Sequence, residues 1–135
     1  MEKKNQRVIW KVIRFNIEGI GQIQQISEKL GHHIEGIKGI HVSIVPTSEV
    51  KEETHDVGEL SLSFNNQKDH TVHITSNYNP DVLSQAFEAF ELNQPLHSHR
   101  IEGYYRDLGN LVNEFGEFIT HEVRILLECT IKSES

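Results

Sequence analysis

Three histidines have the side-chain type and spacing that suit metal binding. His97 and His99 flank a single serine in a segment expected to be a strand, so their imidazoles would point to the same side. His121 lies on the apolar side of the last expected strand and can supply a third nitrogen ligand. His97, His99 and His121 therefore form a candidate metal site. A buried histidine bonded to a backbone carbonyl is the other interpretation of His121.

The residues around the first two histidines resemble a known family motif. Residues 97–102 read His-Ser-His-Arg-Ile-Glu, and Gly109 comes seven residues after Glu102. This pattern resembles the first metal-binding motif of cupins, which reads His-x-His, three or four residues, Glu, six residues, Gly. The resemblance implies a cupin-like metal-binding protein. Only two residues separate His99 from Glu102, however, so in a strand this glutamate points away from the histidines. The second cupin motif, with Pro-x-Gly and a later histidine, is missing.

A second candidate group is aromatic and basic. Tyr104 and Tyr105 stand between Arg100 and Arg106, and such side chains are common at ligand and partner surfaces. Neighbouring residues of a strand face opposite sides, so one tyrosine is expected inside and the other outside. Together with Trp10, the two tyrosines suggest another hypothesis, a sandwich that binds a small ligand or a carbohydrate.

The chain lacks the motifs that mark common enzyme classes. It has no Gly-x-Ser-x-Gly, no phosphate-binding P-loop and no Cys-x-x-Cys. Gly19 and Gly21 begin a dinucleotide-type pattern, but the third glycine position holds Gln24. An enzyme is therefore the weaker class, and no cofactor is expected.

Length and cysteine content predict one domain in a reducing compartment. The chain of 135 residues is long enough for one core and too short for two, so residues 1–135 are expected to form a single β-rich domain. Cys129 is the only cysteine, so no internal disulfide can form and a cytoplasmic location is expected. No apolar run approaches the length of a membrane span.

The charge is distributed unevenly along the chain. Residues 1–14 contain five basic side chains and one acidic one, a local charge of +4 within a formal total of −7, which leaves −11 for the remainder. Such an acidic body repels phosphate backbones. Nucleic acid is therefore disfavoured as a partner, except through the short basic arm at residues 1–6.

Two-residue alternation of apolar side chains predicts most of the elements. Strands are expected at 8–17, 33–46, 59–64, 71–75, 96–108 and 118–131. Residues 22–30 are expected to form a short helix, with a strand as the alternative. A second helix is expected to start at residues 79–81, Asn-Pro-Asp, and to end near residue 93.

These elements define the expected architecture. Because strands and helices do not alternate, the expected fold is mainly β, an antiparallel, jelly-roll-like β-sandwich with one or two short helices. The alternative is an α+β fold with two helices on one face of an antiparallel sheet.

The sequence favours a non-catalytic role. Long strands, a basic arm on an acidic body and the lack of a catalytic motif suggest a structural or assembly module, such as a subunit of a phage-like or other multi-copy particle. The expected partner is a second copy of the chain or another protein, with no membrane involved.

Overall fold

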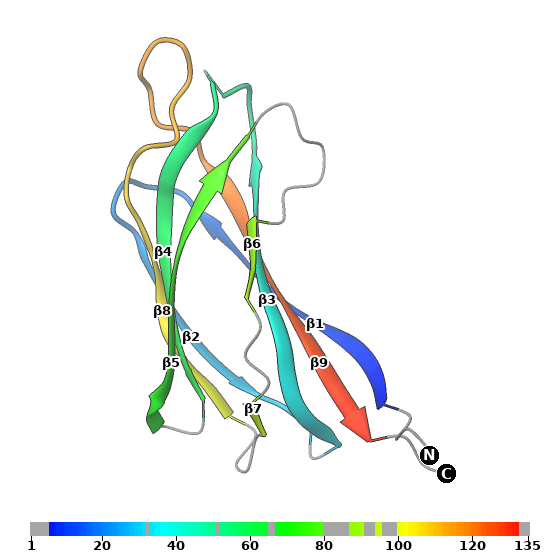
Figure 1. Ribbon diagram of the computed structural model, residues 1–135. Helices are drawn as coiled ribbons and strands as arrows, with labels where there is room; N and C mark the ends of the chain where they lie inside the picture. The colour runs from blue at the N-terminus through cyan, green and yellow to red at the C-terminus, as the bar shows by residue number, and fades with distance from the viewer. Residues whose placement is uncertain are drawn as a thin grey trace.

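The computed structural model describes residues 6–31, 33–50, 52–64, 67–79, 87–90, 94–95 and 100–132, and every element in these segments is a β-strand. Nine strands follow one another along the chain (Figure 1). They are β1 (Gln6–Ile17), β2 (Ile23–Lys29), β3 (Ile34–Pro46), β4 (Thr54–Phe64), β5 (Gln67–Tyr78), β6 (Phe87–Phe90), β7 (Gln94–Pro95), β8 (Arg100–Asp107) and β9 (His121–Lys132).

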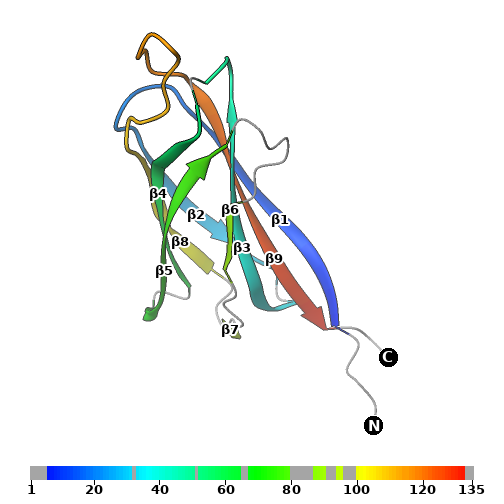
Figure 2. The same ribbon diagram turned by 45° about the horizontal axis from the view of Figure 1, so that its top comes forward.

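The strands form two antiparallel sheets that pack face to face (Figure 2). One sheet has the order β1-β9-β3-β6, with β7 also pairing with β3, and the other has the order β2-β8-β4-β5. The pairs are nested along the chain: β4 with β5, β3 with β6, β2 with β8 and β1 with β9. This nested hairpin is rolled so that β9 also meets β3 and β8 also meets β4. That connectivity is the jelly roll, and the predicted jelly-roll-like sandwich is confirmed.

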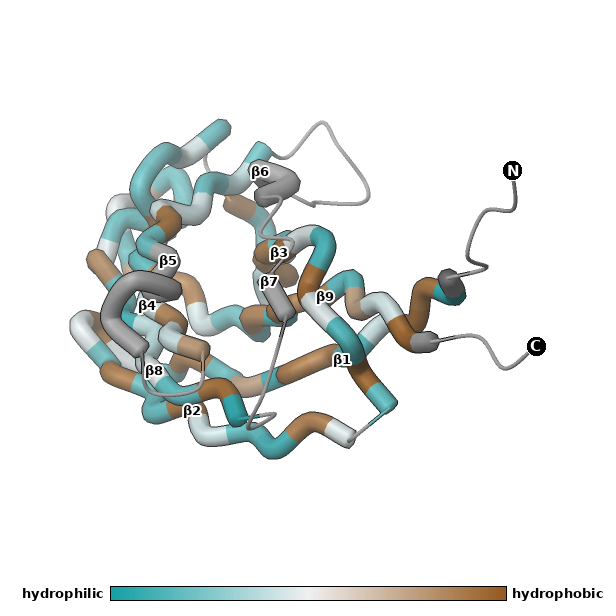
Figure 3. The backbone as a smooth tube through the Cα atoms, turned by 60° about the horizontal axis from the view of Figure 1, so that its bottom comes forward, coloured by the Kyte–Doolittle hydropathy of each residue, from teal (hydrophilic) through white to brown (hydrophobic). Residues whose placement is uncertain are grey.

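The core lies between the sheets, which face each other across the interior when viewed from the end that carries both termini (Figure 3). Alternate residues of each strand enter it, as two-residue periodicity requires. In β9 the inward row is buried throughout: His121, Val123, Ile125, Leu127 and Cys129. Both sheets contribute to one cluster of buried apolar residues. The outward rows are therefore the surfaces that remain for contact with other molecules.

A charged residue interrupts the inward row of β1. Lys11 shares the inward side with Ile9 and Ile13, and its Nζ lies 3.1 Å from Oε1 of Glu28 on β2. Because β1 and β2 are edge strands of opposite sheets, this ion pair bridges the two sheets along one open side of the sandwich. A charge directed inward at a sheet edge also discourages a further strand from pairing there.

The helix predicted at residues 22–30 is wrong, and the strand alternative holds. Residues 23–29 form β2, which pairs with β8 along its whole length. The spacing of Ile23, Ile26 and Leu30 fitted one face of a helix, but only Ile26 and Leu30 are buried, while Ile23 is exposed. Pairing with β8 supplies the backbone hydrogen bonds of this segment and outweighs its weak local preference for a helix.

The second predicted helix falls largely on residues 80–86, which lie outside the described residues. Its last part is described and is wrong, because Phe87–Phe90 form strand β6 beside β3. The α+β alternative, which needed two helices on one face of a sheet, is likewise wrong for the described part of the chain. Aromatic residues suit a strand as well as a helix, so the apolar spacing alone could not decide this segment.

Gly58 makes room for the largest side chain of the core. A methyl group at Gly58 would overlap the phenol of Tyr105, whose hydroxyl lies 2.8 Å from Oγ of Ser76. We expect Gly58→Ala to lower the free energy of unfolding by about 1–3 kcal/mol, because overpacking forces the ring or the strand to move. Urea unfolding measures this change. The matched control is Gly19→Ala, where a new Cβ meets nothing within 4 Å and the change should stay within about 0.5 kcal/mol. Equal effects of the two substitutions would contradict this packing.

Candidate functional site

The outer face of edge strand β1 carries a row of exposed apolar side chains. Val8, Trp10 and Val12 alternate with the inward residues, and 42%, 51% and 44% of their respective surfaces are exposed. We call these three residues the β1 row. Cα atoms two apart in a strand are separated by about 6.6 Å, so the row extends over about 13 Å. It is a continuous apolar surface on a face that otherwise carries polar and charged groups.

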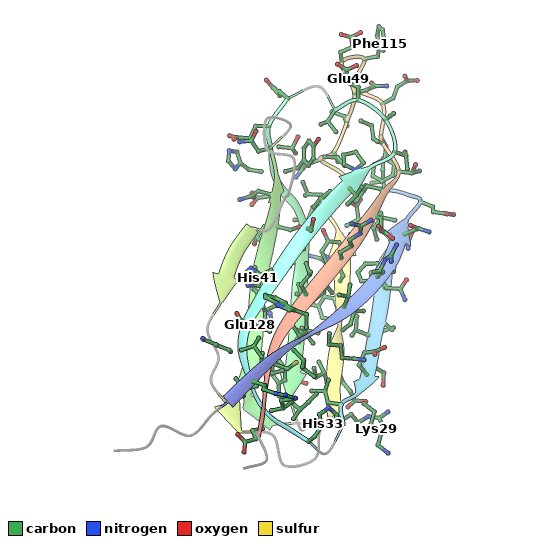
Figure 4. The ribbon with its side chains drawn as sticks, turned by 90° about the vertical axis from the view of Figure 1, so that its right-hand side faces the viewer. Lys29, His33, His41, Glu49, Phe115 and Glu128 are labelled. Atoms are coloured by element: carbon green, nitrogen blue, oxygen red, sulfur yellow. The ribbon has the colours of Figure 1, made fainter. Side chains whose placement is uncertain are left out.

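The β1 row continues sideways over the neighbouring strands. Register places Trp10 level with Glu128 of β9 and Gly39 of β3. Gly39 has no side chain, and the Trp10 ring leans across β9 to contact His41, with the ring centroids 5.4 Å apart. Figure 4 shows His41 and Glu128 side by side on this face. Half-buried Leu126 of β9, level with Val12, adds apolar area beside the row. The surface is thus apolar along one edge and polar toward β3.

The large exposed apolar side chains of the described residues are concentrated in the β1 row. Large apolar side chains are exposed at six described positions, and three of them form the β1 row. Single exposed apolar residues are ordinary, whereas a contiguous group with a tryptophan at its centre marks a contact surface.

A second exposed feature is the hairpin between β8 and β9. Val112 and Phe118 form an isolated bridge, and Oδ1 of Asn113 accepts hydrogen bonds from the backbone N–H groups of Phe115 (2.9 Å) and Glu117 (3.0 Å). Gly116 adopts a φ of 78°, which a glycine tolerates without strain. This well-bonded turn holds Phe115 with 77% of its surface exposed. The loop is ordered around an apolar side chain that has no role in the core.

A cleft lies between this hairpin and the segment that follows β3. It has a volume of about 360 Å³ and is lined by Ser48, Glu49, Val50, Asn113, Glu114 and Phe115. We call it the apical cleft. Figure 4 shows Glu49 and Phe115 together at the end of the molecule away from the termini. Its two carboxylates and its exposed aromatic ring suit a cationic partner.

Beneath the loops at this same end, a carboxylate and a histidine are buried together. Nε2 of His121 lies 3.7 Å from Oδ1 of Asp107, and neither side chain is reached by solvent. Oδ2 of Asp107 accepts hydrogen bonds from the backbone N–H groups of Gly21 (3.2 Å) and Gly109 (2.9 Å). The carboxylate thereby ties the β1–β2 turn to the end of β8. Among the described residues, neither Oδ1 of Asp107 nor Nε2 of His121 has a hydrogen-bond partner, because 3.7 Å is too long for a hydrogen bond between them.

The geometry of this pair fixes the proton of one imidazole nitrogen. Nδ1 of His121 is 2.9 Å from the carbonyl oxygen of Ile119, which can only accept, so Nδ1 carries a proton and donates it. Burial raises the pKa of Asp107, against the opposing effects of its N–H partners and His121. Burial also lowers the pKa of His121, against the Ile119 carbonyl and Asp107. Both shifts therefore oppose charge on these two buried groups.

The predicted metal site remains a prediction. His121 is buried and bonds a backbone carbonyl, whereas His97 and His99 lie outside the described residues. In the described segments, no group of three metal-ligating side chains comes together. The charged neighbour of His121 is Asp107. Asp107 was not among the candidate site residues predicted from the sequence.

The predicted aromatic and basic surface is divided by the fold. Tyr105 points into the core and cannot form part of a surface, because its ring is fully buried. Tyr104 and the two arginines lie on the outer side of the β2-β8-β4-β5 sheet, where Arg100 bonds Ser27 and Glu102, and Arg106 contacts Glu59. Trp10 lies on the outer side of the opposite sheet. The structure therefore does not bring the tryptophan and the tyrosines together.

Comparisons with known proteins show no family for this chain. No protein-family model matches it, and no curated protein matches its sequence. The chain is similar to one chain of the Nora virus structure, at 8% sequence identity and a TM-score of 0.30. The match covers 98% of this chain but only 65% of the other, so the chain spans less than two thirds of that protein. An identity and a TM-score this low carry no functional information.

In the described segments, no helix has the length and apolar character needed to cross a membrane. Because no family is shown for the chain, a functional proposal has to rest on its own surfaces.

Proposed function

We propose that this chain is a non-catalytic structural module that assembles with further copies of itself through the β1 row. The observation that carries the proposal is the contiguous exposure of Val8, Trp10 and Val12 on the outer face of β1. Tryptophan is among the residues that contribute most to protein interfaces, especially at the centre of a patch. In a two-fold symmetric contact the same row serves both partners, so apolar rows are self-complementary.

The contact is made by the face of β1 rather than by its edge. An added strand would have to pair along the edge where Lys11 and Glu28 form their ion pair, and such an inward charge disfavours strand addition. The β1 row points outward, perpendicular to the hydrogen-bonding direction, so it stays available to a second sheet. Packing of two such faces would bury Trp10 and leave both jelly rolls unchanged.

The fold is compatible with this role. Jelly rolls of eight strands build viral capsid subunits, lectins and cupins, so the architecture alone does not select among these functions. The surface supports assembly, and a multi-copy particle, phage-like or of another kind, is the setting we propose.

The test is the mass of the native protein as a function of concentration. Sedimentation velocity of the full chain should show a reversible shift from monomer to larger species as concentration rises. A monomer throughout the concentration range would contradict the proposed function.

A further inference from the structure

We infer that the apical cleft of one copy binds the basic N-terminal segment of another copy, with Lys3 and Lys4 held by Glu49, Glu114 and Phe115. The inference rests on the proposed self-assembly and extends it, because it adds a second contact with a different geometry. Its occupant is a segment of this chain, argued from the charge of the cleft, its shape and the reach of the chain.

The cleft has the chemistry of a cation site. The carboxylates of Glu49 and Glu114 are both exposed, and within the described part of the chain neither forms an ion pair. Val50 is a buried residue of the segment that follows β3, and it gives the lining of the cleft an apolar part. A lysine has an apolar stem and a charged end, so it matches an apolar base with an acidic rim.

Phe115 adds a reason for a cationic partner. Its backbone is held by the hydrogen bonds of the Asn113 turn, and most of the surface of the residue is exposed beside the carboxylates. An aromatic face next to carboxylates attracts an ammonium or guanidinium group, which would cover the ring on binding. The cleft volume of about 360 Å³ lies at the small end of the range for ligand pockets, which suits one or two side chains rather than a folded domain.

The complementary charge lies in the same chain. Residues 1–14 carry a net charge of +4, against −11 for the remaining residues. Lys3 and Lys4 adjoin in sequence and come just before β1, which begins at Gln6. Two adjacent ammonium groups match the two carboxylates of the cleft.

The contact has to form between two copies. Gln6 pairs with Lys132 at one end of the first sheet, whereas Ile17 and Pro46 both pair with His121 at the other end, next to the cleft loops. Eleven residues of strand place Gln6 about 36 Å from that end. Lys3 lies three residues before Gln6 and can reach only about 11 Å beyond it. Figures 1 and 4 show the same separation of the start of β1 from the apical loops.

A contact between opposite ends of two copies has a structural consequence. It is a head-to-tail contact, which uses different surfaces on the two partners and repeats from copy to copy into rings or open arrays. The β1 row, by contrast, can close a two-fold pair. Together the two contacts can build a multi-copy assembly from one chain type.

The test measures binding of a labelled peptide with the sequence of residues 1–7 to the full chain, by fluorescence anisotropy at low salt. The full chain carries Trp10→Ser, which keeps it monomeric at the β1 row. We expect binding that becomes about two- to thirtyfold weaker in the Glu49→Gln/Glu114→Gln variant, because two charge contacts are lost. The control variant Glu18→Gln/Glu52→Gln removes the same charge at exposed positions outside the cleft and should bind the peptide like its parent.

A peptide in which both lysines are replaced by glutamine should bind about two- to thirtyfold more weakly than the native peptide. No binding of the native peptide, or equal binding by the cleft variant and its parent, would overturn the inference. Because the readout does not require association through the β1 row, either result would leave the proposed function untouched. Conversely, if Trp10→Ser leaves self-association unchanged while the peptide binds at the cleft, only the β1 contact is contradicted.

Discussion

Replacing Trp10 by serine is expected to weaken self-association about thirtyfold or more. Trp10 is the central member of the β1 row and the largest exposed apolar side chain on that face. Truncation of a central interface tryptophan typically costs 2 kcal/mol or more of binding free energy, and about 1.4 kcal/mol corresponds to a factor of ten. Sedimentation velocity or light scattering of the variant should show monomer at concentrations where the parent is associated.

The matched control for this experiment is Ile23→Ser. Ile23 is also an exposed apolar residue of an edge strand, with 56% of its surface exposed, but it lies on β2 of the opposite sheet. Its replacement should leave association unchanged. Both variants should unfold at nearly the parental temperature, because neither side chain belongs to the core. Equal weakening by the two substitutions would point to nonspecific apolar contact and would contradict a specific β1 interface.

The second large effect concerns the pH dependence of stability, to which the buried Asp107 and His121 should contribute. The ordinary pKa of an aspartate is 3.8, and burial raises that of Asp107, so the folded chain holds a proton that the unfolded aspartate releases. This contribution to stability is lost as pH rises. The ordinary pKa of a histidine is 6.5, and burial lowers that of His121, so the unfolded chain binds a proton that the folded histidine does not. That contribution is lost as pH falls.

Together these shifts change stability with pH in opposite directions. As pH rises above 3.8, the unfolded aspartate releases a proton that folded Asp107 holds more tightly, so the free energy of unfolding falls. As pH drops below 6.5, the unfolded histidine takes up a proton that folded His121 binds more weakly, so the free energy of unfolding falls again. Each group alone can change it by at most about 1.4 kcal/mol per pH unit.

Asp107→Asn isolates the contribution of the carboxyl group. The amide oxygen can still accept from Gly21 and Gly109, and the amide N–H can donate to Nε2 of His121, but residue 107 no longer titrates. Urea unfolding from pH 4 to pH 9 should therefore show a smaller loss of stability with rising pH than in the parent. Asp56→Asn is the control, since Asp56 is exposed and its φ of 57° is one that asparagine tolerates. An unchanged pH dependence in Asp107→Asn would mean that the pKa of Asp107 is not raised in the folded chain.

The sheet architecture was predictable because alternation persists over long segments. In β9 the residues from His121 to Cys129 alternate without interruption, and a one-residue slip would expose the whole row. The hairpin of β4 and β5 was predictable for the same reason. Segment 23–29 was harder, because the spacing of Ile23, Ile26 and Leu30 fits one face of a helix, and only the pairing with β8 makes the segment a strand.

The buried aspartate was missed although its position was encoded in the same alternation. Ile101, Tyr105 and Asp107 are separated by even numbers of residues, and all three are buried. Applied through the end of the strand, the rule that places the first two inside also places the carboxylate inside. An aspartate at a strand end more often marks a turn, which concealed this signal.

Neither contact surface was recognisable from residue types alone. The sequence placed Trp10 in an expected strand at residues 8–17, but only the sheet order and the burial of its neighbours show that its side chain faces outward. The residues around Phe115 show no alternation of apolar and polar side chains that would indicate which way it points. Its exposure depends on the turn built by Asn113, and the cleft beside it depends on a segment more than sixty residues earlier in the chain.

The most direct test of assembly through the β1 row uses the protein's own fluorescence. Trp10 is the only tryptophan, so its emission reports on this surface and on no other. If the β1 row is the interface, acrylamide quenching should decrease and the emission maximum should shift to shorter wavelength as concentration rises, with the same midpoint as the increase in sedimenting mass. Larger species that form while Trp10 stays as accessible to acrylamide as in the monomer would contradict the proposed interface.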